Sequence, residues 1–211
     1  MKKAQRVIEF YVFCNKLKDL IRTGWTNWGV NRERLESVAE HVFGVQMLAL
    51  AMWSEFEYQI DIKKVLTMLA FHETEEIVIG DITCFDEASK TKTERGHAAI
   101  KKIFGSLCKG FEIENLILEF DERKTPEARF AYFCDKLECD LQCKLYDEQG
   151  CVDVHSQENN KIARSQGVKE MLDSGMSWSE MWLLFGQGKY DYDENFLAVS
   201  NYAKDNQILN K

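Results

Sequence analysis

The stretch Val65-Leu-Thr-Met-Leu-Ala-Phe-His72-Glu73-Thr-Glu75-Glu76-Ile-Val-Ile-Gly80-Asp81 joins an apolar helix pattern to a run of side chains that can bind a metal. Asp61 can cap the start of this helix, and Gly80 can end it because glycine adopts the left-handed backbone conformation without strain. Apolar residues recur between them at helical spacing: Leu66, Leu69, Ala70 and Ile77. The sequence therefore predicts one helix, buried along one side, with a polar cluster near its end.

This polar cluster combines an imidazole with neighbouring carboxylates. Glu76 follows His72 by four residues, so a continuous helix would place both side chains on one face, with Glu73 about 100° around the axis. Burial of such groups without partners costs several kcal/mol. They are therefore expected to be exposed, paired or bound to a metal.

The composition of the whole chain indicates a helical globular protein. The 211 residues fit a single domain with one core, and 45% hydrophobic with 29% charged residues is ordinary for a folded protein. The single proline favours long helices over many short strands. We therefore predict an all-α fold and one domain over residues 1–211.

Charge and cysteine content narrow the expected partners and compartment. A net charge of −8 disfavours polyanions, so we expect neither a nucleic acid polymer nor a membrane as a partner, whereas a small phosphate can bind beside a local Arg or Lys. Seven cysteines without a secretory leader predict reduced thiols and a cytoplasmic location. No apolar run approaches the roughly 18 residues that span a bilayer, so a soluble protein is expected.

Two more residues are candidates for a site because of their places in predicted helices. Ser37 and Glu40 form a capping-box pattern, and His41 follows them in the first turn. Asp135 lies within a helix predicted from Pro126 to about Tyr146, between apolar positions where an isolated carboxylate is costly. Taken alone, His41 is more simply interpreted as a hydrogen-bonded structural histidine.

The amino-terminal helix is predicted over residues 5–22 and ends before Gly24, which leaves Arg22 and Trp25 near a loop. A cation and an aromatic face can bind a ligand there; a surface arginine and a core tryptophan are the alternative. Lys92 belongs to a charged helix and is expected mostly on its solvated face. The charged helix that carries Lys92 is predicted at residues 87–107. Further helices are predicted at residues 112–121, 156–174 and 194–203, and one more follows the capping box at residues 177–180.

The residues fit one kind of chemistry better than others. The helical zinc motif His-Glu-x-x-His is absent because position 76 is Glu. No Ser or Cys stands in a recognisable nucleophile signature. His41, His72 with Glu73, and Asp135 remain, and two imidazoles with two carboxylates suit a divalent transition metal that keeps positions open for water and substrate.

This order of residues resembles the HD superfamily of metal-dependent phosphohydrolases, and within it the bacterial 5'-deoxynucleotidases and related HD-domain-containing proteins. Members carry a histidine on one helix, a histidine with an adjacent carboxylate on the next, and a distant aspartate on a third. Four segments match over roughly residues 5–150: Arg22-Thr-Gly-Trp25, Glu36-Ser-Val-Ala-Glu40-His41, His72-Glu73-Thr-Glu75-Glu76 through Gly80-Asp81-Ile82, and the helix around Asp135.

The resemblance implies a fold and a metal. The fold is an all-α HD-domain helical bundle at about residues 5–150 with a C-terminal helical extension at residues 151–211, assembled as a homodimer. The metal is one divalent ion, with cobalt, manganese or iron favoured over zinc or nickel. Its implied ligands are His41, His72, Glu73 and Asp135.

The same resemblance implies catalytic and substrate roles. Glu76 would orient or deprotonate the attacking water, and Asp81 would lie near the sugar and the water. Arg22 and Trp25 would meet the phosphate and the deoxyribose face. These roles predict removal of the 5'-phosphate from (deoxy)nucleoside 5'-monophosphates by metal-activated water.

Two positions depart from the family pattern. Position 73 is Glu where the superfamily name records Asp, and Glu75 is a candidate substitute ligand. Arg22 and Trp25 are separated by two residues, whereas they are adjacent in other members. The alternative hypotheses are therefore an HD scaffold that binds nucleotides with impaired catalysis, and an HD hydrolase of another phosphate ester.

Overall fold

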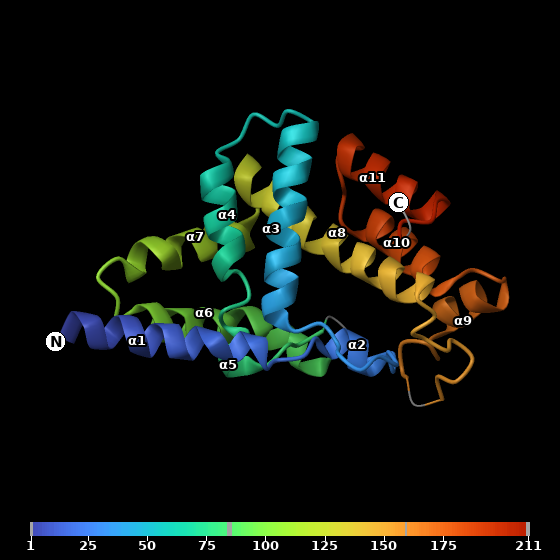
Figure 1. Ribbon diagram of the computed structural model, residues 1–211, viewed down its shortest axis with the longest axis horizontal. Coiled ribbons are helices and arrows are strands. Elements are labelled where there is room, and N and C mark those ends of the chain that lie inside the picture. The colour runs from blue at the N-terminus through green and yellow to red at the C-terminus, as the bar shows by residue number, and fades with distance from the viewer. Residues whose placement is uncertain (1, 84–85, 159, 210–211) are drawn as a thin grey trace. The chain divides into compact units, whose positions relative to one another are not determined.

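The computed structural model describes residues 2–83, 86–158 and 160–209, and the regular elements in these ranges are helices (Figure 1). The described residues also contain an isolated antiparallel bridge between Ile21 and Ser37. Contacts divide the chain into two compact units, the first formed by Met1–Thr23 and Glu36–Tyr132 and the second by Gly24–Leu35 and Phe133–Lys211. The predicted all-α fold is confirmed, whereas a single domain with its core at residues 5–150 stays a prediction.

The amino-terminal helix is shorter than the predicted helix at residues 5–22. The α-helix α1 (Lys2–Cys14) gives way to the 3₁₀ helix η1 (Asn15–Lys18). At the junction, Asn15 Nδ2 donates a hydrogen bond to the Tyr11 carbonyl at 2.8 Å. A side chain that bonds a carbonyl of the preceding turn competes with the helical pattern, which gives a local reason for the change.

After η1 the chain becomes extended around Ile21. Arg22 N donates to the Glu36 carbonyl at 3.0 Å, next to the Ile21–Ser37 bridge, so this segment is tied to the residues directly before the helix that begins at Val38. The prediction that Gly24 ends a helix is wrong, because Gly24 lies inside the short helix α2 (Thr23–Asn27).

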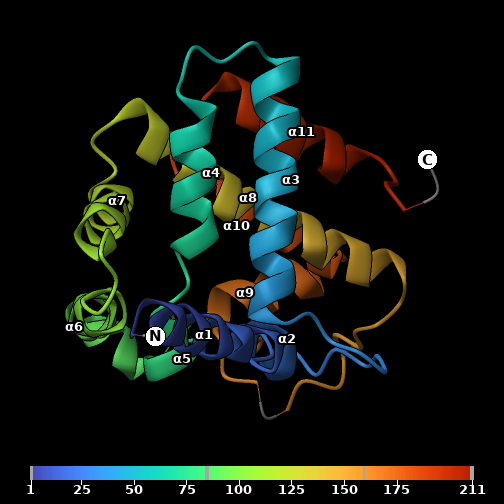
Figure 2. The ribbon, with the colours of Figure 1, turned by 60° about the vertical axis from the view of Figure 1, so that its left-hand side comes forward.

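The helices α3 (Val38–Glu55) and α4 (Ile62–Phe71) lie side by side in the first unit (Figures 1 and 2). The predicted capping box is confirmed: Glu40 N donates to Ser37 Oγ at 3.3 Å, and Ser37 N donates to Glu40 Oε2 at 2.9 Å. Asp61 caps α4 by accepting from two backbone amides of its first turn. Both helices therefore begin where the sequence places their caps.

The single helix predicted from position 61 to Gly80 is wrong. The α4 helix ends at Phe71, and the separate helix α5 (Glu76–Ile79) follows a turn. Within that turn Glu76 N donates to the Glu73 carbonyl at 3.1 Å, a bond over three residues that tightens the chain. Gly80 does end α5, with φ of 82°. His72 and Glu76 consequently belong to different elements rather than to one helical face.

The rest of the first unit supports this turn. Helix α6 (Lys92–Phe104) follows the 3₁₀ helix η2 (Glu87–Thr91) and packs against α7 (Gly110–Glu122), as Figure 2 shows. Their shared core consists of Ile100, Phe104 and Ile117. The predicted start of the next helix, α8 (Pro126–Glu148), is confirmed at Thr125, whose Oγ1 accepts from Ala128 N at 3.3 Å.

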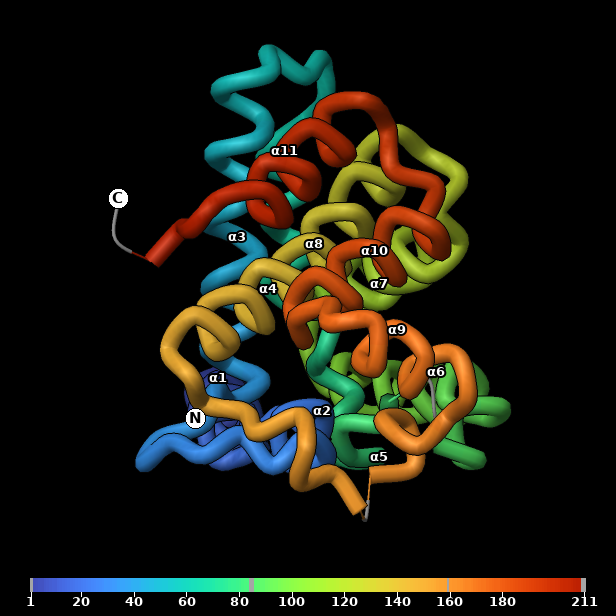
Figure 3. The backbone as a smooth tube through the Cα atoms, turned by 90° about the vertical axis from the view of Figure 1, so that its right-hand side faces the viewer, coloured from blue at the N-terminus to red at the C-terminus, as the bar shows by residue number. Residues whose placement is uncertain are grey.

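The second unit contains the C-terminal part of α8 and three further helices: α9 (Gln166–Asp173), α10 (Trp178–Lys189) and α11 (Glu194–Asp205). Figure 3 shows α10 beside both α9 and α11. The capping box at Ser177 is confirmed, but the helix predicted over residues 156–174 is confined to α9. In the part of the chain that the structure describes, no helix has both the length and the apolar character required to cross a membrane.

Candidate metal centre

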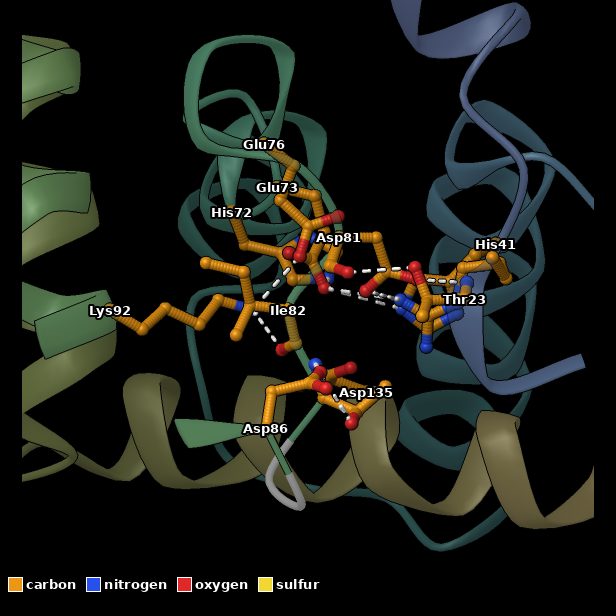
Figure 4. Close-up of polar contacts among 12 residues, drawn as sticks. Thr23, His41, His72, Glu73, Glu76, Asp81, Ile82, Asp86, Lys92 and Asp135 are labelled. Atoms are coloured by element: carbon orange, nitrogen blue, oxygen red, sulfur yellow. Dashed lines mark hydrogen bonds and ion pairs between the residues drawn. The ribbon is translucent and has the colours of Figure 1, made fainter. Parts of the chain in front are cut away.

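Two histidines and one carboxylate converge in the first unit. His41 comes from the first turn of α3, His72 is the residue that caps the end of α4, and Glu73 follows it in the turn. Glu73 Oε1 lies 3.8 Å from His41 Nε2 and 3.6 Å from His72 Nε2. Ligand atoms of all three lie within 4.8 Å of one another, and all three residues are buried (Figure 4). The structure therefore brings together the predicted metal ligands that belong to the first unit.

The orientation of the His72 ring suits metal binding. His72 Nδ1 lies 2.8 Å from the Leu69 carbonyl. Because a carbonyl only accepts, we assign the hydrogen to Nδ1, which leaves the lone pair of Nε2 directed at the Glu73 side. Two imidazole nitrogens and a carboxylate oxygen are donors that divalent transition metals accept. The residues present therefore fit the metal that the sequence predicts.

Asp135, the fourth predicted ligand, lies on α8 in the second unit. Its side chain is buried, and its Oδ2 accepts from Lys136 Nζ at 2.6 Å. The costly carboxylate that the sequence places in the middle of this helix therefore has an ion-pair partner. Its role as a metal ligand stays a prediction from the sequence pattern.

Glu76 is a buried acid beside the converging ligands. Its Oε1 accepts from Lys92 Nζ at 2.8 Å, and its Oε2 is buried with no hydrogen-bond partner among the described residues. Burial raises the pKa of Glu76 well above its ordinary value, with a further rise from the negative charges of Glu73 and Asp81. The positive charges of Lys92 and Arg22 oppose that rise in pKa. Glu76 thus has one oxygen held by Lys92 and a second buried oxygen left for a further contact.

Lys92 is a residue whose role the sequence analysis missed. It was predicted on a solvated helix face, but its ammonium contacts Glu76 from the first position of α6. The two residues are 16 positions apart, with a 3₁₀ helix in the segment between them, so no local spacing pattern connects the two. Only the packing of α6 beside α5 reveals this pair.

Glu75, the candidate substitute ligand, faces a different neighbour. Its side chain lies against Gly96 of α6, where an added Cβ would stand 3.2 Å from Glu75 Cγ. Burial, and then the negative charge of Glu73, raise the pKa of Glu75 to about 8. The converging ligand group contains Glu73 and not Glu75, so the substitution hypothesis for Glu75 is not needed.

Arg22 lies between two carboxylates of the first unit. Its Nη1 is 3.7 Å from Glu73 Oε1 and 3.8 Å from Asp81 Oδ1. Thr23 fixes Asp81, because Thr23 N donates to Asp81 Oδ2 at 2.5 Å and Thr23 Oγ1 donates to the Asp81 carbonyl at 2.7 Å (Figure 4). The predicted residues Arg22 and Asp81 are therefore neighbours of the ligand group, and Thr23 is a supporting residue without a sequence signal.

Trp25 is a core residue of the second unit. Its side chain has 1% exposure, and its ring centroid lies 5.3 Å from that of Tyr146 and 5.4 Å from that of Trp182. Trp178 completes this aromatic cluster at 6.2 Å. Such burial favours the alternative of a core tryptophan over an exposed platform for a sugar.

Comparison with known proteins gives one family. Residues 14–173, a range that holds every predicted site residue, match the model of a family described as HD domain. The protein named 5'-deoxynucleotidase HDDC2 of Dictyostelium discoideum is 35% identical over 150 residues, covering 67% of this chain and 78% of that protein. The protein of the same name from Danio rerio is 30% identical over 145 residues, covering 67% and 70%. The crystal structure of the PH0347 protein from Pyrococcus horikoshii matches with a TM-score of 0.60 and 28% identity, covering 79% of this chain and 96% of that one.

Proposed function

The chain belongs to the HD-domain family, and from this premise we propose that it is a metal-dependent phosphomonoesterase. Its substrates are nucleoside 5'-monophosphates, in their deoxy forms first, and its products are a nucleoside and inorganic phosphate. The observation that carries the proposal is the convergence of His41, His72 and Glu73 beside a buried carboxylate, Glu76. Relatives named 5'-deoxynucleotidase support the substrate class.

The proposed metal ligands are His41, His72, Glu73 and Asp135. The first three converge in one unit, and the family pattern supports Asp135 as the fourth. A divalent metal bound there supplies Lewis acidity, which lowers the pKa of water and offsets negative charge on the phosphoryl group. Cobalt, manganese and iron are the favoured ions, with zinc and nickel as alternatives.

Side chains of the first unit carry out the remaining steps of hydrolysis. Glu76 accepts the proton of the attacking water at Oε2, because Oε1 is engaged by Lys92. The water oxygen forms the new bond to phosphorus, the bond from phosphorus to the 5' oxygen breaks, and the leaving 5' oxygen takes up the proton that Glu76 accepted. Asp81, fixed by Thr23, orients the water and the sugar. The guanidinium of Arg22 offsets the charge of the phosphate.

Several finer assignments stay predictions. Contact between Trp25 and the deoxyribose is one, although the packing of its ring favours a core role. A cytoplasmic location rests on the cysteine content, and a homodimer rests on the family resemblance. An acidic chain with a net charge of −8 supports a small phosphate ester rather than a nucleic acid polymer or a membrane as the partner.

Metal analysis and a substrate panel test the proposed function together. The purified protein is expected to contain close to one divalent ion per chain and to release phosphate from at least one deoxynucleoside 5'-monophosphate. Tight nucleotide binding without release under any added metal would support the catalytically impaired scaffold instead. Release from sugar phosphates or cyclic nucleotides alone would point to an HD hydrolase of another phosphate ester.

A further inference from the structure

Lys92 joins two segments that flank the candidate site. Its Nζ donates to Glu76 Oε1 at 2.8 Å and to the Ile82 carbonyl at 3.3 Å (Figure 4). Glu76 begins α5, and Ile82 follows the glycine that ends it. One ammonium group therefore connects the start of α5 with the chain after its end.

The carboxylate that Lys92 holds is enclosed, whereas the lysine itself reaches solvent. The Glu76 side chain has 0% exposure, and the Lys92 side chain has 30%. A hydrogen bond between an ammonium and a carboxylate is stronger than one between neutral groups, so it restricts the rotation of the Glu76 carboxylate. With Oε1 fixed in this way, Oε2 has a defined position.

The carbonyl that Lys92 holds belongs to a segment that is fixed from a second side. Ile82 follows Asp81, whose carboxylate and carbonyl both accept hydrogen bonds from Thr23. Lys92 and Thr23 thus bind adjacent residues from different elements, α6 and α2. A change at Lys92 is expected to alter the relative placement of Glu76 and Asp81.

We propose that Lys92 is a positioning residue for hydrolysis, which holds the Glu76 carboxylate and the Ile82 carbonyl so that Glu76 Oε2 meets the attacking water. The inference rests on the proposed function, because it assigns Glu76 the role of proton acceptor. Lys92 acts through Glu76 and does not bind the substrate phosphate. Its removal should therefore slow turnover without weakening substrate binding.

Steady-state kinetics of Lys92→Met separate these possibilities. The substitution keeps the aliphatic stem and removes the charge and the donors. We expect kcat to fall about 10- to 100-fold, the usual effect of removing an outer partner of a catalytic group, while KM changes less than about threefold. Lys92→Arg, which keeps a cation with several donors, should recover most of the lost kcat. The matched control Lys101→Met, at an exposed lysine of the same helix, should leave both parameters unchanged.

A double variant tests whether Lys92 acts through Glu76. In the Glu76→Gln background, Lys92→Met should cause no further loss of kcat, because the group that it positions is already disabled. Additive losses, an unchanged kcat in Lys92→Met, or a raised KM with an intact kcat would each overturn the proposal. If Lys92→Met does not fold, Lys92→Gln, which is neutral and polar, takes its place in the same comparison. Wild-type protein that releases phosphate from no substrate would refute the proposed function itself before any variant is compared.

Discussion

Replacing Glu76 by Gln is the sharpest test of the catalytic assignment. Glu76→Gln keeps the size of the side chain and keeps an amide oxygen that can accept from Lys92 Nζ, which lies 2.8 Å from Oε1 in the wild type. It replaces the buried Oε2, the proposed proton acceptor, by an amide nitrogen that cannot accept a proton. The structural disturbance is therefore small and the chemical disturbance is large.

The expected loss follows from the role of a positioned base. General base catalysis contributes about 10²- to 10⁴-fold, so kcat of Glu76→Gln should fall by that factor, or about 2.7 to 5.4 kcal/mol in activation free energy. The metal content should stay at the wild-type level because Glu76 is outside the converging ligand group. Initial rates of phosphate release at saturating nucleotide, with metal analysis of the same sample, measure both quantities.

A neighbouring acid provides the control. Glu75 is also largely buried, but its side chain lies against Gly96 of α6. Glu75→Gln should therefore keep kcat within about threefold of the wild type, which separates the loss of one specific carboxyl group from the loss of any buried acid beside Glu73. A Glu76→Gln protein with full turnover would refute the assignment of Glu76 as proton acceptor, and equal losses in both variants would show that the effect is not specific to the position of Glu76.

Three further outcomes test the site and the second unit. If the free metal concentration is roughly 100 times the dissociation constant, removing the metal with a chelator should lower the melting temperature by about 5 to 10 °C. Added cobalt or manganese should restore the melting temperature, and an unchanged melting temperature would count against a bound metal. Gly186→Ala should destabilise the protein by about 1 to 3 kcal/mol because the new methyl group would overlap Asp140 Oδ2. The control Gly188→Ala, on the same helix, should not destabilise the protein because an added Cβ there meets no atom within 4 Å. Equal stabilities of the two variants would contradict this packing. Burial raises the pKa of Asp140 in the folded protein well above its ordinary value. In the unfolded chain Asp140 ionises near pH 3.9, so its contribution to the stability of the fold decreases as pH rises from about 3.9 toward the folded-state pKa. In urea unfolding, Asp140→Asn should therefore gain stability relative to the wild type on going from pH 4 to pH 7, and a constant difference between the two proteins would exclude this explanation.

The boundaries of several helices could be predicted because caps act over three or four residues. The Ser37–Glu40 and Ser177–Glu180 boxes, the Asp61 cap and the Thr125–Pro126 start each satisfy backbone amides within one turn. The same locality made His72 and Glu73 recognisable, since a histidine followed at once by a carboxylate is a sequence feature. The second unit was less predictable: the weak sequence pattern after position 150 predicted a helix over residues 156–174, whereas among the described residues of that range α9 alone is an α-helix.

Contacts between distant residues decided the rest. The Lys92–Glu76 pair, the Thr23–Asp81 bonds and the burial of Trp25 join residues that no helical spacing relates. The break of the predicted helix after Phe71 could not be predicted for the same reason. A continuous helix and a tight turn both fit the local sequence pattern, and only packing around the turn selects between them. The sequence by itself determined which residues could bind a metal and where most helices begin. Tertiary structure decided which oxygen of Glu76 is held and which remains for a further contact, because that choice depends on an ammonium group brought in by another helix.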